Sequence, residues 1–384
     1  MIGDYADFYV RNFGRAETAL LKANCVGRII ALEDEGLGAT ELQAIYVVGN
    51  VISAAMKFYC PGKRIEYCLV ESEAAGPFIT RFENDEYLII VPVHFVRFVH
   101  IIAALTASTD VFTREARTSY EPAITLENFQ QLPRIPGFGT LHLSVTLKNE
   151  EFVKGMTCLF SCMIGVVVFH EVAHFLHGHL SFCARADAGC DDIALPFSWR
   201  DEAERLLCLE TMEFDADSFA AIAWVHLWAG GIPIPDSFRI FAGNLKRPDW
   251  LVLLSAAVVF LLEDINKIRD PTWVDESAIH RHARTRIIVV INTYGAYLRI
   301  KLQRPEEEVR ELLRDVASDV AKISRYIYNN EISEDYLSDV EKDTEAFGVY
   351  ADKVSSRWAL MYPMLKNLSF RQTGNMPGPT NTPR

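Results

Sequence analysis

The chain has 384 residues and a formal net charge of −13; 50% of its residues are hydrophobic and 23% are charged. This composition is typical of a globular protein with a sizeable core, and the length indicates one or two domains. The acidic balance argues against non-specific nucleic-acid binding, which needs a basic surface.

The cysteines and the apolar stretches indicate a soluble, cytoplasmic protein. Eight cysteines are scattered without a Cys-x-x-Cys pair, as expected for reduced core thiols. Cys183 and Cys190 flank a polar loop and stay open as a bridge or secondary site. The N-terminus has no apolar core segment, so we expect no signal peptide. The longest apolar runs, 155–169 and 250–262, are shorter than the about 18 residues that a membrane span needs.

Apolar periodicity and turn residues predict the elements of the N-terminal part. In chain order these are a helix over 7–32, an amphipathic helix over 41–59, a strand over 64–70, a hairpin with strands 78–82 and 87–91, and an apolar helix over 93–105.

The rest of the chain is predicted to be mostly helical. A polar connection over 106–139, either a lid or a short subdomain, precedes an alternating strand over 140–147 and a long helix that begins at Asn149 or Glu150. Further helices are expected over 199–228, 250–265, 305–328 and 333–347, with a disordered tail over 371–384. We expect one domain over 1–300 and a helical extension over 301–370.

The first long helix contains His170-Glu171-Val172-Ala173-His174, a His-Glu-x-x-His motif. Residues four apart share a helix face, so His170 and His174 can direct two imidazoles at one ion. Glu171 is rotated by about 100° and can take a proton from a bound water. A zinc ion with a third protein ligand and a water is the expected occupant. The alternative is a helix with polar surface residues.

The third ligand is expected on the second long helix. Glu213 and Asp217 are four apart on one face. Glu213 can complete a His₂Glu zinc site, with Glu210 one turn earlier as the rival ligand. Asp217 can accept the N–H of a ligand histidine and fix its tautomer.

Two more histidines follow the motif. His177 lies two turns after His170 and could add a fourth ligand, but four protein ligands would close the site to water. We therefore expect His177 to be structural or to face substrate. His179 is expected to be a hydrogen-bonded polar residue near the helix end.

The pair of motifs, His170-Glu171-x-x-His174 and Glu213-x-x-x-Asp217, resembles the gluzincin metallopeptidases. Similar patterns occur in the CAAX-protease and heat-shock membrane peptidases, the Lit-type phage-exclusion peptidases and the ImmA/IrrE-like regulatory peptidases. The resemblance covers roughly residues 65–225, and only the two helices are specific.

The resemblance implies a zincin-like core, with a small antiparallel sheet beside the metal helix. It implies that an edge strand near Phe78 and Ile79 pairs with extended substrate, although an ordinary core hairpin is equally consistent. It also implies a residue that stabilises the oxyanion, for which His280, His282 and Arg286 are candidates and His282 is our choice. The alternative there is a polar helix start.

The sequence thus predicts a mostly helical α+β protein that acts as a zinc-dependent endopeptidase on a protein or peptide substrate. Zn²⁺ is bound by His170, His174 and Glu213, Glu171 is the general base, and Asp217 and His282 assist. Two alternatives stay open. One is a triggered protease with a single regulatory or phage-defence target, and the other is a non-catalytic interaction module with structural zinc.

Overall fold

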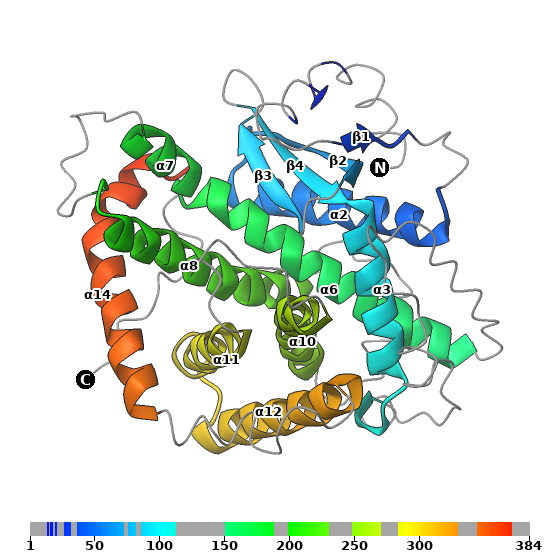
Figure 1. Ribbon diagram of the computed structural model, residues 1–384. Helices are drawn as coiled ribbons and strands as arrows, with labels where there is room; N and C mark the ends of the chain where they lie inside the picture. The colour runs from blue at the N-terminus through cyan, green and yellow to red at the C-terminus, as the bar shows by residue number, and fades with distance from the viewer. Residues whose placement is uncertain are drawn as a thin grey trace. The chain divides into compact units, whose positions relative to one another are not determined.

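The protein is described by a computed structural model (Figure 1). It covers residues 14, 16–17, 20, 27–31, 37–72, 76–81, 86–112, 150–187, 199–229, 248–269, 283–328 and 344–370. These residues form mostly helices and one small sheet, which agrees with the predicted α+β class. The chain divides into two compact units, Met1–Glu171 with Trp224–Ser255, and Val172–Ala223 with Ala256–Arg384. The expected domain division at residue 300 and the zincin-like core stay predictions.

The sheet of the first unit is mixed. Its strand order is β1 (Gly27–Ile29), β2 (Ile65–Ser72), β4 (Tyr87–Pro92), β3 (Phe78–Arg81). β3 and β4 pair antiparallel, as in the predicted hairpin, and β1 pairs antiparallel with β2. β2 and β4 run parallel, so the prediction of an antiparallel sheet is wrong. After β2 the chain forms the edge strand β3 and then β4, which lies between β3 and β2. The parallel pairing of β4 with β2 joins strands that are not consecutive, and no local sequence signal predicts it.

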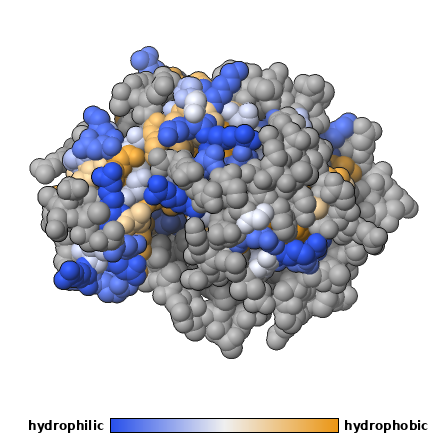
Figure 2. All heavy atoms as spheres, turned by 90° about the horizontal axis from the view of Figure 1, so that it is seen from above, coloured by the Kyte–Doolittle hydropathy of each residue, from blue (hydrophilic) through white to orange (hydrophobic). Residues whose placement is uncertain are grey.

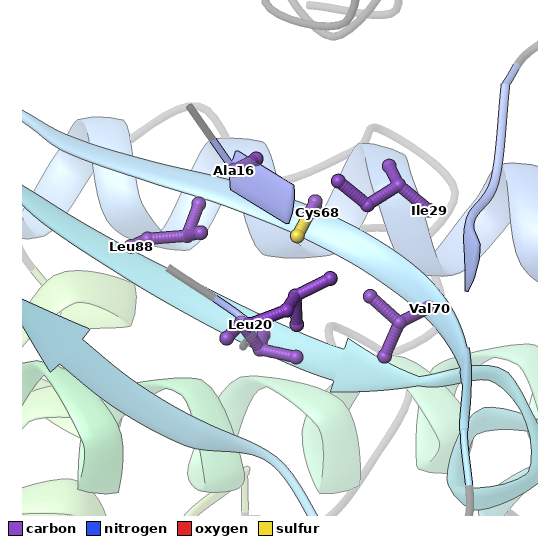
Figure 3. Packing of buried hydrophobic residues seen from close by; sticks show 7 residues of the cluster. Ala16, Leu20, Ile29, Cys68, Val70 and Leu88 are labelled. Carbon is purple, nitrogen blue, oxygen red and sulfur yellow. The ribbon is translucent and has the colours of Figure 1, made fainter. Parts of the chain in front are cut away.

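One face of the sheet carries a buried cluster. Alternate residues of β2 and β4 point to this face and pack with residues from the N-terminal segment (Figure 3). Its members are Ala16, Leu20, Ile29, Cys68, Val70, Leu88 and Ile90. Because Gly27–Ile29 pairs with β2 as a strand, the predicted helix over 7–32 is wrong at its C-terminal end.

Two helices, α2 (Ala39–Tyr59) and α3 (Val93–Ala107), contact the sheet and each other, and both were predicted. The hydroxyl of Tyr67 in β2 donates to the carbonyl of Ile45 in α2 at 3.2 Å. Glu41 is buried, and its carboxylate accepts the backbone N–H of Gly38 at 3.0 Å and Nε of Arg97 at 2.6 Å. This carboxylate therefore caps α2 and joins it to α3.

Three long helices match the predicted helices that begin near residue 150 and that span 199–228 and 250–265. They are α6 (Glu150–Leu176), α8 (Glu202–Ala229) and α10 (Pro248–Arg269). Trp224 in α8 packs on Gly165 in α6, where an added Cβ would lie 3.1 Å from the indole ring. The indole N–H also donates to Sγ of Cys162 at 3.3 Å. The missing side chain at Gly165 therefore allows this close approach.

Among the described helices, α6 is the one long and apolar enough to cross a membrane, over Phe152–Leu176. Most of this stretch is buried inside the structure, and core helices of soluble proteins have the same length and composition. The apolar stretch is longer than the run over 155–169 considered from the sequence. The absence of a membrane span stays a prediction.

The second unit contains α7 (His179–Asp187), α11 (Ala283–Ile300), α12 (Glu306–Tyr328) and α14 (Thr344–Leu368). A buried cluster joins α7, α8 and α14 through Phe182, Cys208, Met212, Met361 and Leu365. α12 matches the predicted helix over 305–328. Of the predicted helix over 333–347, residues 333–343 lie outside the described residues, and α14 covers the rest and continues to Leu368.

The described surface is mainly hydrophilic on the face drawn in Figure 2, with smaller hydrophobic areas between the polar residues. The large hydrophobic side chains exposed in the described part are Ile300, Leu302, Leu360 and Tyr362. Residues 113–139, the predicted strand over 140–147 and the predicted tail over 371–384 lie outside the described residues.

Candidate metal centre

The C-terminal end of α6 carries polar residues after a long buried apolar stretch. Val166–Phe169 are all buried, which holds this part of the helix in place. His170 and Glu171 follow and are only 9% and 7% exposed. Burying such groups is unfavourable unless they find polar or ionic partners. Their position therefore indicates a specific site.

The structure brings together the three predicted ligands. One donor atom from each of His170, His174 and Glu213 lies within 4.8 Å of the others, so the group could hold a metal ion. Nε2 of His174 is 3.5 Å from Oε1 of Glu213. The rival ligand Glu210 is buried one turn earlier on α8, but it does not belong to this group.

A second group that could hold a metal ion consists of His177, His179 and Asp215. Asp215 was not identified from the sequence. It is two residues from Glu213, and side chains two apart on a helix point about 200° apart, so helical projection did not pair them. The signal that could have found it is the acidic pair Glu213 and Asp215 together with the His-x-His pattern after the motif.

A glycine turn positions His179. Gly178 ends α6 with a φ of +80°, a conformation that side chains disfavour. Its N–H donates to the carbonyl of Phe175 at 3.2 Å, and α7 begins at the next residue. An added Cβ would lie 2.8 Å from the carbonyl carbon of Leu368. Glycine is therefore required both by the backbone and by the close packing of α14.

The turn places His179 between a ligand of the first group and Asp215. Nδ1 of His179 is 3.0 Å from Nδ1 of His174, and its Nε2 is 3.1 Å from Oδ2 of Asp215. His177 also contacts Asp215 through Nδ1. Nε2 of His177 is buried with no hydrogen-bond partner among the described residues.

Burial and hydrogen bonding set the protonation of this pair. Burial lowers the pKa of His179. Burial raises the pKa of Asp215, but the charge of His177 and the hydrogen bonds from His177 and His179 outweigh it and hold that pKa well below its usual range. Asp215 is therefore an ionised acceptor, and His179 is a neutral imidazole that can donate from one nitrogen and accept at the other.

Asp217 and Arg286 form a buried ion pair. Both oxygens of Asp217 accept hydrogen bonds from Arg286, each at 2.7 Å. The guanidinium also lies over the ring of Phe260, 4.4 Å from its centroid. Asp217 was expected to orient a ligand histidine, and Arg286 was one of three candidates for stabilising an oxyanion. The structure shows the two side chains paired with each other, and both roles stay predictions. Asp215 makes carboxylate–imidazole contacts of the kind expected of Asp217.

Some of the predicted site residues lie outside the described residues. His280 and His282 are outside the described residues, so His282 stays a prediction as a catalytic residue. Cys183 is a free thiol, whereas Cys190 lies outside the described residues. None of the six described cysteines is in a disulfide, and their reduced state stays a prediction.

Comparison with protein-family models, with curated proteins and with solved structures finds no match. The support for a metal site therefore comes from the identity and the arrangement of His170, His174 and Glu213.

Proposed function

We propose that this protein is a zinc-dependent endopeptidase with His170, His174 and Glu213 as its metal ligands. Two imidazoles and one carboxylate are the donor set of His₂Glu catalytic zinc sites. Zinc bonds of about 2.0–2.1 Å at tetrahedral angles separate two donor atoms by about 3.4 Å. The 3.5 Å between Nε2 of His174 and Oε1 of Glu213 fits this value and carries the proposal.

Three protein ligands leave one position of a tetrahedral site for water, as catalysis requires. The side chains of His174 and Glu213 are 13% and 18% exposed, so solvent can approach them. A bound zinc ion would acidify a water molecule there and polarise a substrate carbonyl.

Glu171 is the proposed general base. It follows His170 directly in α6 and is rotated by about 100° from it, so it can face the open side of the ligand pair. Its carboxylate accepts the proton of the attacking water and then returns it to the leaving amine. We further propose that β3, an edge strand of the described sheet, pairs with an extended peptide substrate.

The test is Glu171→Gln, which keeps the shape of the side chain and removes the base. We expect peptide hydrolysis to fall by about 100-fold or more, while the zinc content stays at the wild-type level. Glu202→Gln, in the exposed first turn of α8, is the matched control and should leave both unchanged. An unchanged rate in Glu171→Gln would refute the assignment.

The same variant separates the alternative functions. New protein termini in cells with wild-type protein, but not with Glu171→Gln, would identify substrates and show whether there is a single target. Zinc-loaded wild-type protein that produces no new termini and cleaves no peptide would instead favour a structural metal.

A further inference from the structure

We infer that Asp215, acting through His179, fixes the orientation and tautomer of His174. Asp215 and His179 are therefore positioning residues of the metal site. This inference rests on the proposed metal site but does not require that the site is catalytic. It concerns the second group of possible ligands, which could otherwise hold an ion of its own.

The contacts permit one protonation pattern when His174 is a ligand. Nε2 of His174 faces Glu213 and must be unprotonated to bind a metal, so its proton is on Nδ1. Nδ1 is 3.0 Å from Nδ1 of His179, which must then accept. The proton of His179 is consequently on Nε2, 3.1 Å from the Asp215 carboxylate. In this series of hydrogen bonds, from His174 through His179 to Asp215, each N–H donor faces an acceptor.

A second ion bound to His179 and Asp215 requires the opposite pattern. Nε2 of His179 would have to be unprotonated, and its proton on Nδ1 would be donated to Nδ1 of His174. The proton of His174 would then be on Nε2, where it blocks the first site. Because the two sites need opposite tautomers of His174, they cannot both bind an ion. With the ion at the first site, as proposed, the second group supports it.

Burial makes the arrangement rigid. His179 is 1% exposed, and the side chain of Asp215 is 9% exposed, so water hardly competes for these hydrogen bonds. The rings of His174 and His179 are 5.1 Å apart between centroids, at 69°. A carboxylate and a neutral imidazole thus hold the ligand in the way that partners behind metal-binding histidines usually do.

The test compares zinc binding in variants of the full chain. Zinc affinity is measured by chelator competition in wild type, Asp215→Asn and His179→Phe. Loss of partners behind a ligand histidine lowers metal affinity by about 10- to 100-fold, and we expect both variants to fall in this range. Asp215→Asn is nearly isosteric, so it still gives a result if His179→Phe does not fold.

The matched control is His177→Phe. His177 is also buried, at 9% exposure against 1% for His179, and it contacts the same carboxylate. The hydrogen bonds that link Asp215 to His174 do not pass through it. We expect its zinc affinity to stay within a few-fold of wild type. Nitrogen NMR of the His174 ring provides the readout that a merely structural role would not change. Wild type should show a protonated Nδ1 and a metal-bound Nε2, and Asp215→Asn should show mixed states.

Three results would overturn the inference: two zinc ions per wild-type chain with the second lost in His177→Phe, wild-type affinity in both Asp215→Asn and His179→Phe, or no zinc binding by wild type. Zinc binding that depends on Asp215 without any peptide cleavage would support the inference while refuting the proposed function.

Discussion

The ion pair between Asp217 and Arg286 allows a quantitative test of what supports α8. Their side chains are 0% and 6% exposed, and two hydrogen bonds of 2.7 Å join them. Arg286→Met keeps much of the apolar stem but removes the guanidinium from a buried carboxylate. Leaving one ion of such a pair uncompensated costs about 3–5 kcal/mol. We expect the free energy of unfolding to fall by about this amount.

The assay is urea unfolding followed by circular dichroism at a fixed zinc concentration. Arg205→Met is the control, because Arg205 pairs with Glu202 at the exposed start of the same helix and its loss should leave the midpoint almost unchanged. Combining Arg286→Met with Asp217→Leu removes both charges and should recover most of the lost stability. A midpoint of Arg286→Met equal to that of Arg205→Met would refute the reasoning.

Two further changes probe the backbone and the pH response. Gly178→Ala should lower the free energy of unfolding by more than Gly62→Ala, since both have positive φ but only Gly178 also has backbone within 2.8 Å of the added Cβ; equal denaturation midpoints would contradict this. The positive φ alone costs about 1–2 kcal/mol. Burial lowers the pKa of His100, opposed by the charge of Glu41, so the folded state binds a proton less readily than the unfolded state. This contribution to stability is present above the ordinary pKa of 6.5 and is lost as the pH falls below it. His100→Phe should therefore flatten the loss of stability as the pH falls below 6.5, by at most about 1.4 kcal/mol per pH unit; an unchanged slope in denaturation curves would count against the assignment.

Much of the fold was predictable because its helices are long and apolar. α2, α3, α6 and α8 each follow from helical periodicity and from the turn residues that end them. The hairpin of β3 and β4 follows from its local turn. The parallel pairing of β2 with β4 does not, because register between strands depends on contacts far apart in the chain. The same limit explains β1, which was taken as part of a helix.

The candidate ligands were predictable because helical spacing determines which residues share a face. His170 and His174 come from a single helix, and Glu213 comes from a neighbouring motif. The contact between Asp215 and His179 was missed because His179 follows the turn between α6 and α7. Gly178 interrupts the helix there with a positive φ, and spacing along one helix does not describe such a turn.

The partner of Asp217 was also beyond sequence reasoning. Arg286 lies 69 residues further along the chain, on α11. Whether an acidic residue orients a histidine depends on which donor side chains the fold places beside its carboxylate. Sequence spacing does not show this.

The chain after α14 contacts the C-terminal end of α6. The Ser369 hydroxyl donates to the carbonyl of Leu176 at 2.6 Å, although the two residues are 193 positions apart. The next residue, Phe370, stacks on Phe175 with ring centroids 4.6 Å apart. Shortening the protein at Leu368 would thus loosen the last turn of the helix that carries His170 and His174. A purification tag should accordingly be attached after Phe370 and should not replace Ser369 and Phe370.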